Sequence, residues 1–231
     1  MNKNPIFCAI DTVDVDAARA TANKLTGLLG GIKLGLEFFT ANGCEGVRRV
    51  MADADLPLFI DLKFHDIPNT VAGAVRGISS LAPAFFTIHA GGGSAMMKAA
   101  VEAAEGSSKV LAVTILTSLS EADMEPLGIG GKVADQVKRL ADLAQASGVD
   151  GLVCSPQEVQ LLRAHLGSSM TLVVPGIRPS GSAADDQART LTPVQAMRAG
   201  ADHLVIGRPI TAAADPVQAA KAILTSLQEA A

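Results

Sequence analysis

The sequence predicts an α/β protein, a single-domain (β/α)8 TIM barrel that spans residues 1–231. Two observations lead to this fold. Short apolar runs alternate with Ala-rich helical runs along the whole chain, which is typical of parallel strands covered by helices. The alternation repeats eight times at about 29 residues per unit, and such barrels usually contain roughly 200–250 residues.

The expected strands are short, apolar and rich in β-branched residues. In chain order they are 5–11 (PIFCAID), 31–36 (GIKLGL), 57–63 (PLFIDLK), 85–90 (FFTIHA), 109–116 (KVLAVTIL), 151–155 (GLVCS), 171–177 (TLVVPGI) and 203–209 (HLVIGRP). Such near-continuous apolar runs indicate strands that are buried on both faces of a parallel sheet.

The expected helices are rich in Ala, Leu, Val, Lys and Glu. They lie at about 14–28, 38–54, 68–81, 94–105, 132–147, 156–166, 192–199 and 215–229, with the longest irregular stretches at about 117–131 and 178–191. Asp14 can cap the first helix, and Thr192-Pro193 and Asp215-Pro216 each place a capping residue before a proline of the first turn. Gly148 and Gly200 follow helical runs, where a left-handed residue is expected.

An open, doubly wound parallel sheet is the alternative fold. It would carry a glycine-rich fingerprint directly after the first strand. This chain has Asp11-Thr12-Val13 at that place, so the closed barrel is favoured.

Composition and charge exclude several classes of protein. A chain that is 48% apolar and 18% charged is not disordered, and a net charge of −4 without Trp or Tyr disfavours nucleic-acid binding. Membrane-spanning and signal-peptide patterns are missing from the sequence. The widely spaced Cys8, Cys44 and Cys154 form no CxxC pair. We therefore expect a reduced, cytoplasmic chain without membrane attachment.

Polar or charged residues end nearly every expected strand. They are Asp11, Lys33, Asp61 with Lys63, His89, Thr117, Ser155, Arg178 and Arg208. The carboxyl ends of barrel strands meet at one face, where active sites are built. Chance would place only one or two such residues there, so the ring predicts an active site.

The segment 59–70 (FIDLKFHDIPNT) is the richest in such residues. Asp61 and Lys63 are two residues apart, so on a regular strand their side chains share the face that points into the barrel mouth. A carboxylate and an ammonium group at this distance influence each other's charge state. Asp66 lies beyond the strand end, on a loop from which it can point elsewhere.

The ends of the last two strands predict a phosphate site. The segment VVPGIRPSGS ends the seventh expected strand and VIGRPI ends the eighth, and the glycine-containing chain at this part of a barrel commonly binds phosphate. Arg178 and Arg208 can contact an anion, and Gly207 lets the backbone approach it closely.

The same face offers ligands for a metal ion and a second glycine-rich run. Asp61, Asp66 and His89 could ligate a divalent cation, but Lys33 and Lys63 would repel it, so no metal is expected. The AGGGS run after His89 is a second possible anion nest. We expect His89 itself to form hydrogen bonds behind the site.

The segment DLKFHDIPNT at 61–70 resembles the signature of the orotidine 5′-phosphate decarboxylase family, and the short chain is similar to its bacterial branch. Further segments match in the family's order: AID at Asp11, IKLGLE around Lys33, AVTILTS around Thr117, PGIRPSGSAADDQ at 175–187 and VIGRPI at 205–210. The resemblance implies a lyase that converts orotidine 5′-monophosphate to uridine 5′-monophosphate in pyrimidine biosynthesis. It also implies that neither a metal nor an organic cofactor takes part.

The resemblance implies a role for each site residue. Lys63 would protonate C6 of the pyrimidine, within a charged network that also contains Lys33, Asp61 and Asp66. Substrate would be bound by Asp11 and Lys33 at the ribose, Thr117 and Ser118 at the base, and Arg178, Gln187, Gly207 and Arg208 at the phosphate. In a homodimer, Asp66, Ile67 and Thr70 would reach into the partner's site.

Three alternatives stay open. A sister decarboxylase of 3-keto sugar acid phosphates uses magnesium, but it carries an acidic residue at the position of Lys33 and lacks the IPNT continuation. A phosphosugar isomerase or epimerase would need a carboxylate or a cysteine as general base, and its site would not contain the two lysines found here. A non-catalytic binder of phosphorylated ligands would have no need for Lys63 and Asp61.

Overall fold

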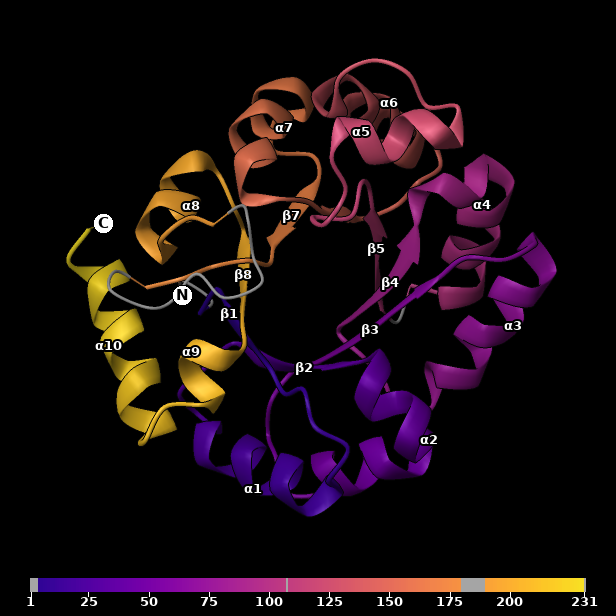
Figure 1. Ribbon diagram of the computed structural model, residues 1–231. Coiled ribbons are helices and arrows are strands. Elements are labelled where there is room, and N and C mark those ends of the chain that lie inside the picture. The colour runs from indigo at the N-terminus through magenta and orange to yellow at the C-terminus, as the bar shows by residue number, and fades with distance from the viewer. Residues whose placement is uncertain (1–3, 107, 180–189, 231) are drawn as a thin grey trace.

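Eight parallel strands form a closed barrel in chain order, which confirms the predicted fold class (Figure 1). The structure, a computed structural model, describes residues 4–106, 108–179 and 190–230. The strands are β1 (Ile6–Ala9), β2 (Gly31–Gly35), β3 (Leu58–Phe64), β4 (Phe85–His89), β5 (Lys109–Val113), β6 (Gly151–Val153), β7 (Thr171–Val174) and β8 (His203–Ile206). The barrel closes where β1 pairs with β8, with Ile6 opposite Leu204.

Helices connect the strands and surround the barrel (Figure 1). Those expected from the sequence are α1 (Val15–Leu25), α2 (Leu36–Met51), α3 (Pro68–Ser79), α4 (Gly93–Ala104), α6 (Val133–Ala146), α7 (Val159–Leu166), α8 (Pro193–Ala199) and α10 (Pro216–Gln228). Shorter helical turns are α5 (Glu121–Met124), α9 (Arg208–Thr211), η1 (Ala90–Gly92), η2 (Glu125–Leu127) and η3 (Pro156–Glu158).

Short helices lie where the sequence predicts none. The stretch expected to be irregular at 117–131 contains α5 and η2, because the Asp123 carboxylate accepts hydrogen bonds from the N–H and the hydroxyl of Ser120 and so caps a turn. The last expected strand stops at Ile206 instead of 209, because Gly207 leaves the extended conformation and Arg208 begins α9.

The predicted helix caps are confirmed. The Asp14 and Asp215 carboxylates each accept hydrogen bonds from two N–H groups of the first turns of α1 and α10, and the Thr192 hydroxyl accepts one from the Gln195 N–H of α8. Gly148 and Gly200 have positive φ angles of 79° and 108°. These caps satisfy N–H groups that a helix cannot bond internally.

The barrel interior holds its own apolar cluster, separate from the layer between strands and helices. It contains Phe7, Ala9, Phe59, Phe85, Leu111, Val173 and Val205. The rings of Phe7 and Phe59 pack edge to face at 6.1 Å. Asp61 and Thr87 follow Phe59 and Phe85 by two residues, so they lie one layer nearer the carboxyl ends of the strands. The apolar cluster is thus the floor of the candidate site.

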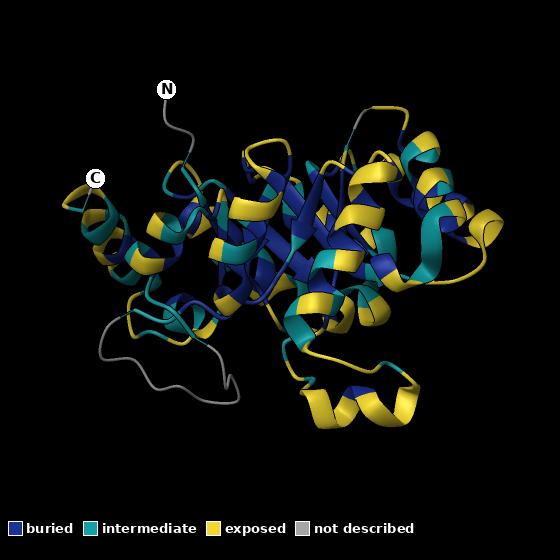
Figure 2. Cartoon of the chain, turned by 90° about the horizontal axis from the view of Figure 1, so that it is seen from above, coloured by how far each residue is buried: buried dark blue, intermediate teal, exposed yellow. Residues whose placement is uncertain are grey.

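Buried residues lie mainly in the strands, and exposed residues lie on the outer faces of the helices (Figure 2). Within the described ranges, no helix has the length and apolar character needed to cross a bilayer.

Candidate active site

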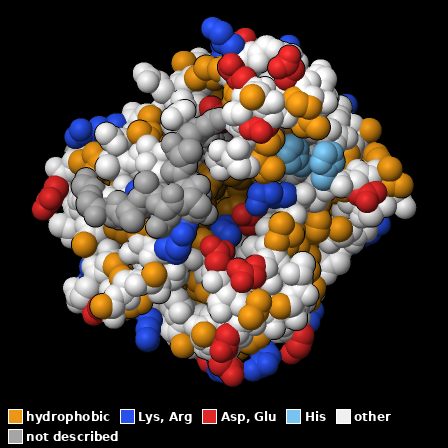
Figure 3. All heavy atoms as spheres, in the orientation of Figure 1, with side chains coloured by type: hydrophobic (Ala, Val, Ile, Leu, Met, Phe, Trp, Pro, Cys, Tyr) orange, Lys and Arg blue, Asp and Glu red, His pale blue; other side chains and the backbone are white. Residues whose placement is uncertain are grey.

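Four charged side chains from the ends of the first three strands form an alternating chain. Lys33 Nζ lies 3.4 Å from Asp11 Oδ1 and 3.7 Å from Asp61 Oδ2. Lys63 Nζ donates a hydrogen bond to Asp61 Oδ1 at 2.9 Å. The structure therefore brings together Asp11, Lys33, Asp61 and Lys63 as the sequence predicts. Acidic and basic side chains meet near the centre of this face (Figure 3).

The charges of this chain depend on one another because they are partly removed from water. Lys33 is buried, and the Asp61 side chain retains 15% exposure. Burial alone would raise the pKa of Asp61, but Lys33, Lys63 and the hydrogen bonds from Lys63 and Thr87 together hold that pKa below its usual range. Asp61 is thus a carboxylate at neutral pH, positioned between two lysines.

The backbone around Lys63 is not a regular strand, which corrects one step of the sequence argument. Lys63 has a left-handed φ of 51°, and the pairing of β3 with β4 shifts register between Ile60 and Phe64. Asp61 and Lys63 do meet, but an irregular backbone brings them together and not the simple alternation along a strand that their spacing predicts.

Thr87 on β4 is a site residue that the sequence analysis missed. Its hydroxyl donates to Asp61 Oδ1 and accepts from the Lys63 N–H, both at 2.9 Å. The signal available in the sequence was a hydroxyl inside the apolar run FFTIHA, which also fits an ordinary strand.

Asp66, Ile67 and Thr70 form no ion pair with the charged chain within the described residues. Asp66 is exposed and accepts a hydrogen bond from the Ile67 N–H at 2.6 Å. Ile67 is 67% exposed, and Thr70 is exposed in the first turn of α3. None of the ion pairs among the described residues joins Asp66 to Lys63.

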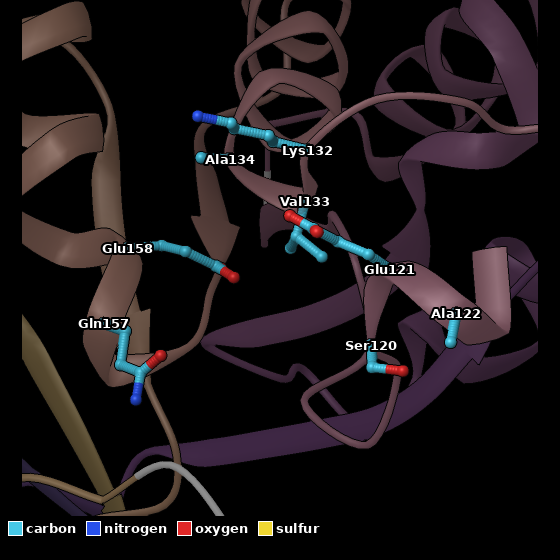
Figure 4. A pocket seen from close by; sticks show the side chains of 8 residues that line it. All are labelled: Ser120, Glu121, Ala122, Lys132, Val133, Ala134, Gln157 and Glu158. Carbon is cyan, nitrogen blue, oxygen red and sulfur yellow. The ribbon is translucent and has the colours of Figure 1, made fainter. Parts of the chain in front are cut away.

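The loop after β5 carries the predicted base contacts and borders a separate cavity. Thr117 is half-buried and Ser118 exposed. A cavity of about 560 Å³ lies between this loop and η3, lined by Ser120, Glu121, Ala122, Lys132, Val133, Ala134, Gln157 and Glu158 (Figure 4). Of the described residues that line it, none belongs to the predicted site. Ser155, in the predicted ring of strand-end residues, is buried and its hydroxyl caps η3.

The predicted phosphate residues follow β7 and β8. Arg178 is half-buried and its Nη1 donates to the Ile177 carbonyl at 3.1 Å. Arg208 is exposed and begins α9. A Cβ on Gly207 would lie 3.4 Å from the Ala9 side chain and 3.7 Å from Asp11 Oδ2, so Gly207 places the end of β8 beside Asp11. Gln187 lies outside the described residues.

His65 and His89 stack beside the charged chain, with ring centroids 5.1 Å apart and planes 9° from parallel. His89 Nδ1 accepts a hydrogen bond from the Gly91 N–H, as expected of a supporting residue. Burial, followed by the proximity of His65 and Lys63, lowers the pKa of His89 below its ordinary value. A Cβ on Gly91 would lie 3.0 Å from His89 Nδ1, so this glycine makes room for an imidazole.

Candidate metal ligands do not gather in this part of the molecule. Across the described ranges, no three His, Cys, Asp or Glu side chains are grouped in a way that could hold a metal ion.

Comparisons with known proteins confirm the family resemblance. Residues 4–223 match the model of the orotidine 5′-phosphate decarboxylase / HUMPS family. The orotidine 5′-phosphate decarboxylase of Rhodospirillum rubrum is 54% identical over 231 residues, covering 96% of this chain and 94% of that protein. That of Paramagnetospirillum magneticum is also 54% identical, covering 97% and 98%. The crystal structure of the Lactobacillus acidophilus orotidine 5′-phosphate decarboxylase superposes with a TM-score of 0.85 at 34% identity, covering 97% of this chain and 99% of that one. The chain therefore belongs to the orotidine 5′-phosphate decarboxylase / HUMPS family.

Proposed function

We propose that this chain decarboxylates orotidine 5′-monophosphate to uridine 5′-monophosphate, the last step of de novo pyrimidine nucleotide synthesis. The observation that carries the proposal is the alternating chain Asp11, Lys33, Asp61 and Lys63 at the carboxyl ends of the barrel strands. Relatives at 54% identity over nearly the whole chain bear the name of this activity.

In the proposed mechanism Lys63 is the proton donor. Cleavage of the bond between C6 and the carboxylate releases CO2 and leaves the bonding electron pair on C6. The Lys63 ammonium stabilises this charge and transfers a proton to C6, which completes the product. Asp61 Oδ1, 2.9 Å from Lys63 Nζ, holds the ammonium group in place before the transfer. Solvent then returns a proton to the lysine.

Substrate binding is divided among several parts of the chain. Asp11 and Lys33 are proposed to hold the ribose hydroxyls, and Thr117 and Ser118 to face the base. Arg178, Gln187, Gly207 and Arg208 are proposed to bind the phosphate. Contacts to this remote group supply binding energy that orients the pyrimidine over Lys63.

The active form is proposed to be a homodimer with shared sites. In one chain Asp66 does not reach Lys63, although the charge alternation would continue with a carboxylate there. The segment from 65 to 70 is exposed throughout, and it includes an Ile67 that is 67% exposed. Insertion of Asp66, Ile67 and Thr70 into the partner's barrel would bury this apolar side chain and complete the charged network.

We propose that no metal or organic cofactor takes part and that the enzyme is cytoplasmic. Lys33 and Lys63 supply positive charge where a divalent cation would otherwise have to sit. The three cysteines are free thiols, the form that a reducing compartment maintains. Burial raises the pKa of Cys8 to about 12, so this thiol is unsuited to the general-base role that an epimerase would need.

The test is an absorbance assay with orotidine 5′-monophosphate, run with and without a chelator. The ultraviolet absorbance of the pyrimidine is expected to fall at the same rate in both. Turnover that stops with the chelator would contradict the proposed independence from metal, and the lack of any turnover would contradict the proposed activity.

A further inference from the structure

The pairing between β3 and β4 has a gap beside the charged chain. Ile60 pairs with Phe86, and the next matched pair is Phe64 with Ile88. Three residues of β3, from Asp61 to Lys63, therefore lie opposite the single residue Thr87 of β4. The backbone ladder cannot bond all of these groups, so some of them are left for partners outside the ladder.

The hydroxyl of Thr87 occupies this gap. Thr87 is completely buried, and its Oγ1 lies 2.9 Å from both the Lys63 nitrogen and Asp61 Oδ1. The backbone N–H of Lys63 can only donate, so Oγ1 accepts there. The single hydroxyl proton is then directed to the carboxylate of Asp61. Both hydrogen-bonding directions are thereby determined.

These two bonds act on both members of the Asp61–Lys63 pair. The hydroxyl holds Asp61 Oδ1 where Lys63 Nζ also binds it at 2.9 Å, and leaves Oδ2 facing Lys33. The second bond holds the backbone of Lys63 at a φ of 51°, a conformation that a residue with a side chain keeps only when its surroundings require it.

We propose that Thr87 is a positioning residue, whose hydroxyl sets the relative placement of the Asp61 carboxylate and the Lys63 ammonium. This inference rests on the proposed function, since its effect is read in the decarboxylation step. Thr87 is not among the residues proposed to contact substrate. Loss of its hydroxyl should therefore slow the chemical step, while Asp11, Arg178 and Arg208 still bind the substrate.

The test uses three substitutions that separate the hydroxyl from the volume of the side chain. Thr87→Ser keeps the hydroxyl and loses the methyl group. Thr87→Ala loses both, and Thr87→Val keeps the shape but loses the hydroxyl. With the pair misplaced, kcat of the Ala and Val variants should fall by about 10- to 100-fold with KM within about threefold of wild type. Thr87→Ser should restore kcat to near the wild-type value.

Thr114 provides a matched control. It follows β5, is as completely buried as Thr87, and its hydroxyl has no hydrogen-bond partner among the described residues. Thr114→Val should therefore leave kcat and KM near wild type. Circular dichroism and thermal melting would be recorded for every variant, to compare folding at the assay temperature.

The outcomes separate the inference from the proposed function. If wild type shows no turnover, both are wrong. If wild type is active and Thr87→Ser behaves like Thr87→Ala, or Thr87→Val like wild type, only the positioning role is wrong. Ala and Val variants that fail to fold beside a folded Ser variant would show that the hydroxyl serves stability, which would also overturn the positioning role.

Discussion

Lys63 Nζ lies 2.9 Å from Asp61 Oδ1 even though the backbone of Lys63 is left-handed, with a φ of 51°. A regular strand would place residues two apart on one face, but here an irregular pairing with β4 intervenes. The lysine is thus held at both ends, at the ammonium by Asp61 and at the backbone N–H by Thr87. A proton donor constrained in this way needs little reorganisation when charge develops on the substrate.

Substitution of Lys63 should remove the chemistry and leave the fold intact. Lys63→Ala is expected to lower kcat by more than about 10³-fold, because both charge stabilisation and the proton donor are lost. Initial rates of absorbance loss measure this, with circular dichroism as the check on folding. Lys24→Ala, at an exposed position of α1, is the control and should be fully active. Near-normal turnover of a folded Lys63→Ala would mean that another group donates the proton.

Substitution of Arg208 should weaken the nucleotide and spare the nucleoside. Loss of a charge-assisted contact to phosphate costs at least about 1.5–3 kcal/mol, so kcat/KM for the nucleotide should fall by about 10- to 150-fold or more in Arg208→Ala. The rate with phosphate-free orotidine should scarcely change. Arg49→Ala, on the exposed face of α2, serves as control. An equal loss with both substrates would place Arg208 away from the phosphate.

Complementation between two inactive variants tests the shared site. Lys63→Ala and Asp66→Ala homodimers are each expected to be nearly inactive. A mixed dimer contains one intact site, with Lys63 from one chain and Asp66 from the other. Random mixing makes about half of the dimers mixed, so co-expression should recover roughly a quarter of wild-type activity.

The control for this experiment co-expresses Lys63→Ala with Lys33→Ala. Both residues belong to the same barrel, so a mixed dimer has no intact site and activity should stay low. If Asp66 acts within its own chain, the Lys63→Ala and Asp66→Ala mixture will behave like this control, and the shared-site proposal will be wrong.

The stacking of His65 on His89 predicts that His65 influences the pKa of His89. The pKa of His89 is lowered first by burial and then by His65 and Lys63, so His65→Gln should raise the His89 pKa towards its ordinary value without restoring it fully. Titration of the imidazole C–H signals by NMR measures this change. His165→Gln, on α7, should leave the His89 titration unchanged. An unchanged His89 pKa in His65→Gln would show that burial and Lys63 account for the lowering.

The same pKa has a consequence for stability. The folded state favours neutral His89. The contribution of His89 to the free energy of unfolding is therefore complete above the unfolded-state pKa of about 6.5. It is lost as the pH falls from that value through the lowered pKa of the folded state. Denaturant unfolding at several pH values should show that the free energy of unfolding decreases as the pH is lowered below about 6.5. A smaller decrease is expected in His65→Gln.

Much of this protein is predictable from local sequence patterns. Alternating apolar and helical runs predict the closed barrel, and the capping residues Asp14, Thr192 and Asp215 lie where the helices begin. These features follow from interactions between residues close in the chain, which one sequence records directly. The gathering of Asp11, Lys33 and Asp61 is predictable too, because parallel strands end at one face.

The tertiary structure alone decided how the charged residues are placed relative to one another. The register shift opposite Thr87 and the left-handed Lys63 arise from pairing between β3 and β4, whose residues are distant in sequence. The separation of Asp66 from Lys63 likewise depends on the direction in which the chain leaves β3. Backbone pairing between strands and the path of a loop depend on contacts across the whole barrel, and the residue types at these positions do not specify them.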